Sequence, residues 1–432
     1  MSTRECNALE QLYAKENVRF AVLVSLPVRS VEAVEEALRS GVGSHSMAKI
    51  QLLPPSSMTL RRETIVLHRR EVSSSDMAAV LTDEINRFVP PEALELVVLI
   101  EDGASWGFMI NTCHGTCDGR SIMASVNIVA SLLEGAIARS SLSFDPLPQV
   151  PPDWCSLLQG GSEPLPFSNT PISLEELHWS GSSPSPRGEL RIDIEKNVLD
   201  QVLPHLKEIK ATLTGFIAAC LIQAVGESWL SSRPAESQCF VSVNLNVDLR
   251  GSIRKDYKGA IPQAIGTVTI GHQVTKVNSL PLKTTLAAMA TEITKDMKTR
   301  VQRGEAVHAA MLMAKEGWFS DSLPKGTFNL SSWGIVDIAP GYQMMSAQRS
   351  NSSTGASIVA QTEGGSGVLR LALAADPNLK APMSHCMRRA IELLCQQGDK
   401  AHLPSEIGSK SILGTSPDRN QLNQSSAWVS KL

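Results

Sequence analysis

Asn111-Thr-Cys-His-Gly-Thr-Cys-Asp-Gly-Arg-Ser121 joins two segments of different periodicity. The residues before it, 94–100 and 106–110, are mostly apolar, which is typical of a buried strand. The residues after it, 121–134, repeat apolar side chains every three or four positions, which predicts an amphipathic helix. A histidine, an aspartate and two glycines therefore lie at a strand-to-helix junction, where an α/β protein can hold a reactive group at the edge of a crevice.

The composition is that of a globular protein. The chain has 432 residues, of which 42% are hydrophobic and 19% charged, and this length favours two domains. The net charge of −3 gives no electrostatic reason to expect nucleic acid as a partner. We expect no signal peptide and no membrane span, because the first residues are polar and no run of about 18 apolar residues occurs. The scattered cysteines indicate reduced thiols and a cytoplasmic location.

The first part of the chain predicts a layered arrangement of strands and helices. Besides the elements around His114, we expect strands at 18–26 and 64–68 and helices at 4–16, 30–39 and 75–88. Ser30 can cap the second of these helices. Residues 140–187 differ, because nine of the 24 prolines fall there and no hydrophobic period survives, which predicts a long crossover.

A similar mixture of elements follows the crossover. We expect helices from 196 and at 213–229, 283–300, 305–316 and 383–396, and strands at 189–194, 240–250, 328–334, 357–361 and 368–374. The prediction is thus an α/β (α+β layered) protein, divided as an N-terminal subdomain at 1–140, a crossover at 141–187, a C-terminal subdomain at 188–403 and a tail at 404–432.

His114 is the best candidate for a general base, because imidazole titrates close to neutral pH. Gly115 and Gly119 remove side-chain bulk on both sides of it, as expected where another molecule approaches the backbone. Asp118 stands at the helix entry, where a carboxylate can cap backbone N–H groups. The spacing alone leaves open that Asp118 is only a cap and that the glycines are only turn residues.

Other chemistries find less support. Cys113, His114, Cys117 and Asp118 are all metal-ligand types, but no second Cys/His pair lies at a zinc spacing, so we expect no metal. A Gly-x-Ser-x-Gly elbow, a Walker loop and a Gly-x-Gly-x-x-Gly turn are absent, which removes the motifs of serine hydrolases, NTPases and dinucleotide-binding proteins.

His114-Gly-Thr-Cys-Asp-Gly119 resembles the His-x-x-x-Asp-Gly motif of the chloramphenicol-acetyltransferase-like superfamily. That superfamily includes the BAHD acyltransferases, alcohol acetyltransferases, mycocerosyl transferases and condensation domains. The opening Arg4-Glu-Cys-Asn-Ala-Leu-Glu-Gln-Leu-Tyr-Ala14 resembles the opening of the alcohol acetyltransferase and polyketide-associated branch. Val247-Asp-Leu-Arg250 and Asn329-Leu-Ser-Ser-Trp-Gly334 resemble two further family strands. Pro340-Gly-Tyr-Gln-Met-Met345 replaces the plant Asp-Phe-Gly-Trp-Gly motif, which argues against a plant BAHD enzyme.

The resemblance implies two pseudo-duplicated chloramphenicol-acetyltransferase-like subdomains with an interface tunnel. His114 would be the general base, Asp118 would hold the loop by pairing with Arg250, and Gly119 would leave room for substrate. Candidates for oxyanion or substrate contacts across the tunnel are Ser332, Trp333 and Asn329. Without the resemblance, Arg250 is equally well a solvated arginine and Trp333 equally well a core aromatic residue.

The activity that the resemblance implies is transfer of an acyl group from a thioester, acyl-CoA or acyl carrier protein, to the hydroxyl of a small molecule in secondary metabolism. O-acylation is favoured over N-acylation of an amine, no cofactor is bound permanently, and the protein is expected to be a monomer. Two alternatives stay open. One is a condensation-type enzyme that forms or cyclises an amide or another bond, and the other is a catalytically silent scaffold that binds a small molecule.

Overall fold

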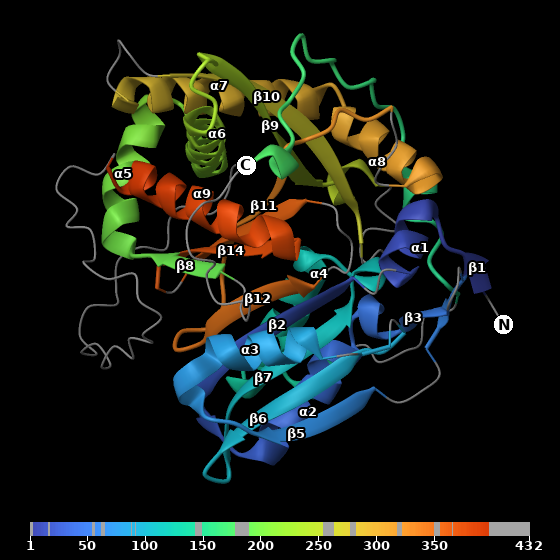
Figure 1. Cartoon of the computed structure of the whole chain (residues 1–432). Coiled ribbons are helices and arrows are strands. Elements are labelled where there is room, and N and C mark those ends of the chain that lie inside the picture. Colours follow the sequence, from blue (N-terminus) through green and yellow to red (C-terminus); the bar gives the residue numbers. More distant parts are fainter. Residues whose placement is uncertain are drawn as a thin grey trace.

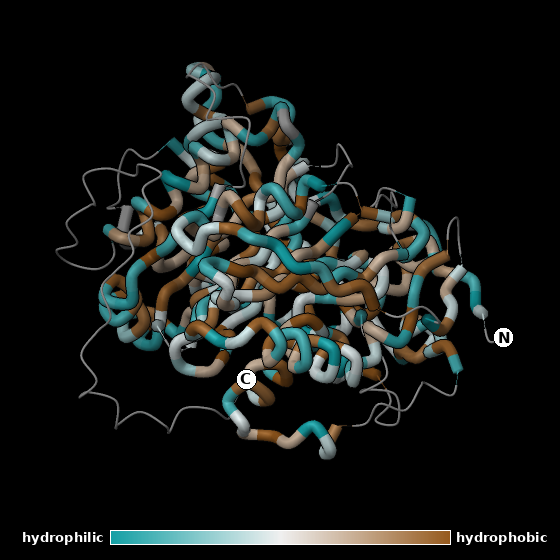
Figure 2. The backbone as a smooth tube through the Cα atoms, turned by 90° about the horizontal axis from the view of Figure 1, so that it is seen from below, coloured by the Kyte–Doolittle hydropathy of each residue, from teal (hydrophilic) through white to brown (hydrophobic). Residues whose placement is uncertain are grey.

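The computed structural model describes residues 3–15, 18–53, 57–61, 65–87, 89–90, 92–142, 149–177, 190–253, 263–276, 282–317, 322–349, 355–364 and 366–396. Two large mixed sheets, each covered by helices, lie one above the other in Figure 1. Hydrophobic stretches run through the middle of the molecule in Figure 2. The predicted tail at 404–432 lies outside the described residues.

The lower sheet is built mainly from the first part of the chain. Its strand order is β12 (Gln343–Arg349), β2 (Arg19–Arg29), β7 (Ala104–Cys113), β6 (Glu95–Glu101) and β5 (Val66–Glu71). Alternate residues of β2 enter different cores, because successive side chains of a strand point to opposite faces. One face packs on α2 (Val31–Gly43) and α4 (Gly119–Leu133), and the other on α3 (Met77–Asn86).

The upper sheet belongs to the second part of the chain. Its strand order is β10 (Ile265–Thr275), β9 (Gln238–Asp248), β11 (Phe328–Val336), β13 (Ala356–Glu363), β14 (Leu369–Ala375) and β8 (Leu190–Ile194). The helices of this half are α5 (Lys196–Glu208), α6 (Leu213–Ser231), α7 (Leu282–Gln302), α8 (Glu305–Glu316) and α9 (Pro377–Cys395). The helix α6 packs against α7, α9 and β9 and forms the centre of this core.

A third, three-stranded sheet supports the N-terminal helix. Its strand order is β1 (Thr3–Glu5), β4 (Ser57–Leu60) and β3 (Ile50–Leu53). The helix α1 (Ala8–Lys15) lies next to it and packs on both α8 and the turn that carries His114. This corner of the molecule therefore joins the N-terminus to both halves.

Among the described residues, α6 is the one helix that is long and apolar enough to cross a membrane. However, 72% of its most apolar window is buried inside the protein. The sequence predicted an almost completely apolar helix at 213–229, and the structure confirms it as the core helix of the upper half.

Most predicted elements are present, but five strands were missed. The strands β1, β3 and β4 have only three or four residues each, too few for a periodic pattern. The strand β10 contains Gly266 and Gly271, which lower strand propensity. The predicted helix at 4–16 was wrong at its start, because residues 3–5 form β1.

The strand β12 shows that the second part of the chain contributes one strand to the lower sheet. It belongs by sequence to the second part, yet it pairs antiparallel with β2 along its whole length, from Gln343 opposite Ser25 to Arg349 opposite Arg19. Figure 1 shows this orange strand beside the blue strand of the lower sheet. The division at 1–140 and 188–403 stays a prediction, and residues 343–349 complete the sheet of the other half.

Candidate active site

His114 lies immediately after β7 in a single 3-10 turn formed by His114–Thr116. Its backbone N–H donates to the Val18 carbonyl at 2.9 Å, which ties the turn to the start of β2. Its Nδ1 lies 3.0 Å from the Cys117 carbonyl oxygen. Because a carbonyl only accepts hydrogen bonds, Nδ1 carries the proton and Nε2 keeps a lone pair. The loop thus selects the tautomer that a general base acting through Nε2 requires.

Aromatic rings surround this imidazole. The Tyr13 ring stacks on it, with centroids 4.7 Å apart and planes 12° apart. The Phe20 ring approaches at 5.9 Å and contacts the Trp333 ring at 5.3 Å. Burial among these groups lowers the pKa of His114 below its ordinary value. The imidazole is therefore neutral, and able to accept a proton, at neutral pH.

Asp118 has hydrogen-bond partners at both carboxylate oxygens. It caps α4, because Oδ1 accepts from the Ser121 backbone N–H at 3.0 Å. Oδ2 accepts from the Ala264 backbone N–H at 3.0 Å, and Nη2 of Arg250 lies 3.0 Å from Oδ1 and 2.9 Å from Oδ2. Only 3% of the Asp118 side chain is exposed, and these contacts to Ser121, Ala264 and Arg250 occupy both of its oxygens.

Arg250 joins the two halves of the chain at the entrance to α4. Besides Asp118, its guanidinium donates to the Ser121 hydroxyl at 2.9 Å and to Asp248 at 3.1 Å. Arg120 reinforces the same junction with a more exposed pair to Asp248 at 3.2 Å. The sequence-predicted partners Asp118 and Arg250 are thus in direct contact.

Gly119 lies directly beneath Trp333. A Cβ atom added at Gly119 would lie 2.6 Å from Cε2 and Cζ2 of the indole, far inside van der Waals contact. Trp333 is the extra residue of a β-bulge, because Ser332 pairs with Ala360 and Gly334 with Gln361. Bulges redirect side chains next to functional sites. The room beside Gly119 is therefore filled by the indole, and the prediction that this room is kept for substrate gains no support.

The other candidates on β11 divide between its two faces. The Ser332 hydroxyl faces α6 and lies 2.8 Å from the Thr214 hydroxyl. Asn329 accepts from the Asn244 amide at 2.9 Å. Ser331, which sequence reasoning missed, accepts from the Trp333 indole N–H at 3.3 Å. The signal that could have found Ser331 is the two-residue period of a strand, which places it on the same face as Asn329.

A pocket of about 190 Å³ lies beside this face of β11 in the upper half. Its polar lining includes a hydrogen-bonded group in which Thr269 donates to Asn244 at 2.8 Å and Asn244 donates to Asn329. Its apolar lining includes Met313 and Leu323. Asn329 lies four residues along β11 from Trp333, so one strand connects this pocket to the aromatic cluster at His114.

The two cysteines that flank His114 pack as small hydrophobic residues. Cys113 is 1% exposed and Cys117 is fully buried. Burial raises the pKa of the Cys113 thiol to about 11 and that of Cys117 well above its ordinary value. Within the described ranges, no group of three or more His, Cys, Asp or Glu side chains is arranged to hold a metal ion.

Comparisons with known proteins identify the fold. No family model and no curated protein match the sequence. Among solved structures, trichothecene 15-O-acetyltransferase from Fusarium sporotrichioides aligns with a TM-score of 0.63 and 12% identity over 92% of this chain and 96% of that one. The first condensation domain of the calcium-dependent antibiotic synthetase aligns with a TM-score of 0.61 and 12% identity over 92% of this chain and 97% of that one.

Polyketide synthase associated protein 5 from Mycobacterium tuberculosis aligns with a TM-score of 0.58 and 14% identity over 92% of this chain and 99% of that one. The chain therefore has the two-subdomain fold of chloramphenicol-acetyltransferase-like acyltransferases and condensation domains. At sequence identities this low, the structural similarity establishes the fold alone, and the reaction has to be argued from the residues of the site.

Proposed function

We propose that this protein is an acyltransferase that moves an acyl group from a thioester donor to the hydroxyl of a small molecule, with His114 as the general base. The observation that carries the proposal is the hydrogen bond between Nδ1 of His114 and the Cys117 carbonyl, which leaves Nε2 as the proton acceptor. The fold shared with an acetyltransferase and with condensation domains supports the same class of reaction.

In the proposed reaction, Nε2 of His114 takes the proton of the acceptor hydroxyl as its oxygen attacks the thioester carbonyl. This attack forms the C–O bond of the ester and gives a tetrahedral intermediate. The intermediate then collapses, so that the carbonyl double bond is restored and the C–S bond breaks. The departing thiolate takes the proton back from Nε2, which returns the imidazole to its neutral state. Proton transfer of this kind contributes about 100- to 10,000-fold to rate.

The remaining residues would bind and orient the reactants. Asp118 and Arg250 hold the His114 loop, and Trp333, Ser332 and Asn329 are candidates for contacts to the oxyanion or to substrate. We place one substrate in the pocket beside Asn329 and the other on the opposite side of His114, in a tunnel between the halves. The donor is acyl-CoA or an acyl carrier protein, no metal or permanent cofactor takes part, and the working unit is a monomer in secondary metabolism.

A condensation-type reaction is the second candidate, because condensation and cyclization domains share the fold. The same histidine would then assist an amine, or another nucleophile, in attacking a carrier-bound thioester. The two candidates differ in acceptor and donor carrier, so products of O- and N-acylation distinguish them.

The test incubates purified protein with a panel of acyl-CoAs and acyl carrier proteins in extracts that contain hydroxyl and amine acceptors, and detects acylated products by mass spectrometry. We expect His114→Ala to lose at least about 100-fold in turnover. His205→Ala is the matched control, since His205 lies on α5 with 40% of its side chain exposed. Undiminished turnover by His114→Ala would overturn the general-base assignment. Consumption of no thioester by the wild type would favour the silent scaffold.

A further inference from the structure

The N-terminal helix α1 reaches His114 with one aromatic side chain. Tyr13, near its end, stacks on the imidazole with ring centroids 4.7 Å apart and planes 12° apart. Two backbone hydrogen bonds join α1 to the histidine turn through Val18. The Val18 N–H donates to the Tyr13 carbonyl, and the Val18 carbonyl accepts from the His114 N–H, both at 2.9 Å. The helix, the start of β2 and the histidine turn therefore form one connected unit.

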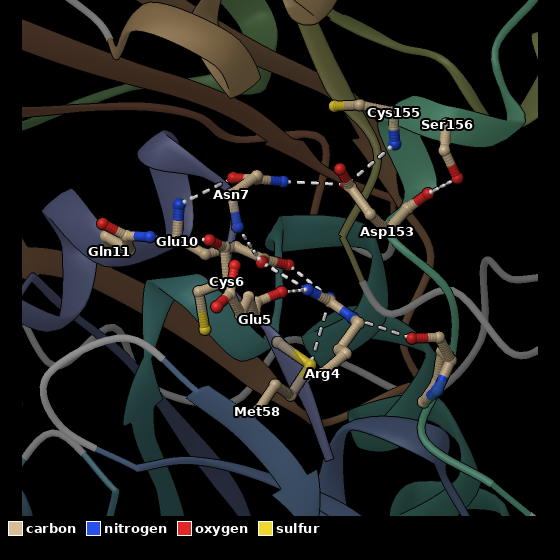
Figure 3. Close-up of polar contacts among 11 residues, drawn as sticks. Arg4, Glu5, Cys6, Asn7, Glu10, Gln11, Met58, Asp153, Cys155 and Ser156 are labelled. Carbon is tan, nitrogen blue, oxygen red and sulfur yellow. Dashed lines mark hydrogen bonds and ion pairs between the residues drawn. The ribbon is translucent and has the colours of Figure 1, made fainter. Parts of the chain in front are cut away.

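A partly buried polar cluster holds α1 in place (Figure 3). Asn7 and Glu10 form a reciprocal cap, in which Asn7 Oδ1 accepts from the Glu10 N–H at 2.9 Å and Glu10 Oε2 accepts from the Asn7 N–H at 3.0 Å. Arg4 donates to both Glu10 oxygens at 2.7 Å. Glu10 is 1% exposed, and its carboxylate is held by these hydrogen bonds from Arg4 and Asn7.

The same cluster connects α1 to the segment that crosses between the halves. The Asn7 amide donates to Asp153 at 2.9 Å, and Nε of Arg4 donates to the Pro151 carbonyl at 2.8 Å. A Cβ atom at Gly115 would lie 3.5 Å from the Glu10 carbonyl and 3.6 Å from Cβ of Tyr13, and it would clash with Leu52 at 2.7 Å. The absent side chain at Gly115 therefore leaves room for Leu52, while α1 lies at van der Waals distance from the same turn.

One hydrogen bond does not fix an imidazole ring. The bond from Nδ1 to the Cys117 carbonyl sets the position of that nitrogen, but the ring can still rock about the Nδ1–oxygen direction. A parallel aromatic ring at 4.7 Å blocks this rocking on one face and excludes water there. Tyr13 thus controls the direction of Nε2, the atom on which the proposed chemistry depends.

We propose that Tyr13 is a positioning residue for His114, and that the Arg4–Asn7–Glu10–Asp153 cluster holds α1 so that the Tyr13 ring stays on the imidazole. This inference rests on the proposed role of His114 as base. It adds that the N-terminal helix and the crossover segment together set the orientation of that base and its shielding from water.

The test compares Tyr13→Phe, which keeps the ring, with Tyr13→Leu, which removes it. The readouts are kcat and KM for the acyl transfer and the pKa of His114 from carbon-edited NMR, with the His114 signal assigned by its loss in His114→Gln. For Tyr13→Leu we expect kcat to fall about 10- to 100-fold with little change in KM, because a small misplacement of a catalytic group costs that much.

The groups that face His114 and could affect its titration are Asp118 on its own loop, Cys113 and Cys117 beside it, and Tyr13 on α1. His45 and Arg250 approach Asp118 from α2's end and β9's end. The variant Tyr13→Leu removes the Tyr13 ring and leaves the other groups in place. Water admitted to the imidazole should therefore raise the pKa of His114 toward its ordinary value.

The conservative variant and a control complete the experiment. We expect Tyr13→Phe to stay within about threefold of wild type in kcat with its His114 pKa unchanged. Lys15→Ala, exposed on the same helix, is the control for unspecific effects on α1. Glu10→Gln should shift the His114 pKa in the same direction as Tyr13→Leu by a smaller amount, because it weakens the cluster without removing the ring.

Two results would overturn the proposal. If Tyr13→Leu keeps the wild-type kcat and His114 pKa, the stack does not position the base. If Tyr13→Phe is as damaged as Tyr13→Leu, the hydroxyl acts and not the ring. The pKa of His114 is measured without turnover, so it tests the Tyr13 stack independently of the reaction. If the acyltransferase assignment itself is wrong, the wild type consumes no thioester, whatever pKa the NMR gives.

Discussion

The carboxylate of Asp118 lies 2.9 Å from Nη2 of Arg250, although 132 positions of the chain separate the two residues. This contact joins the start of α4 in the lower half to the end of β9 in the upper half. The same carboxylate caps α4 and accepts from the Ala264 N–H. The His114 loop is therefore held from both halves at once, and its geometry depends on how they pack together.

Removing this carboxylate should destabilise the protein strongly. We expect Asp118→Ala to lower the free energy of unfolding by roughly 3–5 kcal/mol, because α4 loses its cap, the Ala264 N–H loses its acceptor, and Arg250, with only 18% of its side chain exposed, loses one of its carboxylate partners. Urea denaturation followed by tryptophan fluorescence measures this change. The control is Arg120→Ala, which breaks the exposed pair with Asp248 and should cost about 0–1 kcal/mol. Equal losses of unfolding free energy in the two variants would show that Asp118 stabilises the protein no more than the exposed Arg120–Asp248 pair does.

Gly119→Ala should displace the Trp333 indole. The new Cβ would lie 2.6 Å from two ring atoms, and overpacking of this kind costs about 1–3 kcal/mol. Gly251→Ala is the control, since no atom lies within 4 Å of its added Cβ and its stability should change by less than about 0.5 kcal/mol. Combining Gly119→Ala with Trp333→Phe should cost less than the sum of the two single changes. Strict additivity in thermal or urea unfolding would contradict a direct clash.

The pH dependence of turnover should report the buried imidazole. Burial lowers the pKa of His114 below the ordinary value of 6.5, so the neutral, proton-accepting form persists into mildly acidic solution. We expect the acidic limb of kcat/KM, where Nε2 becomes protonated, to be centred below pH 6.5. Measurement across pH 4–8 checks this. An acidic limb centred above pH 6.5 would show that His114 is more exposed to water, or that another group limits the rate.

Stability should also depend on pH through His45. Its Nδ1 accepts from the Met47 N–H at 3.2 Å. Burial, and next the Arg250 guanidinium, lower the pKa of His45 to about 4 from 6.5. Below pH 6.5 the unfolded chain binds a proton that the folded chain does not, so this contribution is present above pH 6.5 and is lost as pH falls toward 4. His45→Asn keeps an acceptor for Met47 and should flatten the pH dependence of the urea midpoint in that window. If the urea midpoint of His45→Asn depends on pH as the wild type's does, His45 is not a source of the pH dependence of stability.

The thiols next to His114 should be unreactive in the folded protein. All the described cysteines are buried except Cys395, which is partly exposed. Burial raises the pKa of Cys113 to about 11, so little thiolate is present at neutral pH. Native alkylation with iodoacetamide, followed by peptide mass spectrometry, should label Cys395 first. Rapid labelling of Cys113 or Cys117 would mean that the histidine turn opens to solvent.

Local patterns allowed much of the fold to be predicted. The helix at 305–316 was predicted from its period of apolar residues, and α6 from the continuous apolar run that follows Thr212. Both signals are contained in adjacent residues. The strand β12 was not found. It lies at the edge of the lower sheet, and its pairing with β2 connects residues more than 300 positions apart, which no local period can express.

In the candidate site too, the features set by neighbouring residues could be predicted, and the contacts between residues distant in the chain could not. The sequence by itself determined that His114 follows a buried strand and that Asp118 opens a helix, because strand burial and helix capping depend on near neighbours. Only the tertiary structure decided that the Tyr13 ring lies on the imidazole, that Trp333 fills the space at Gly119, and that Ser332 faces α6. These contacts arise from the packing of surfaces distant in the chain, and burial against such surfaces, more than residue type, sets the pKa and direction of the histidine.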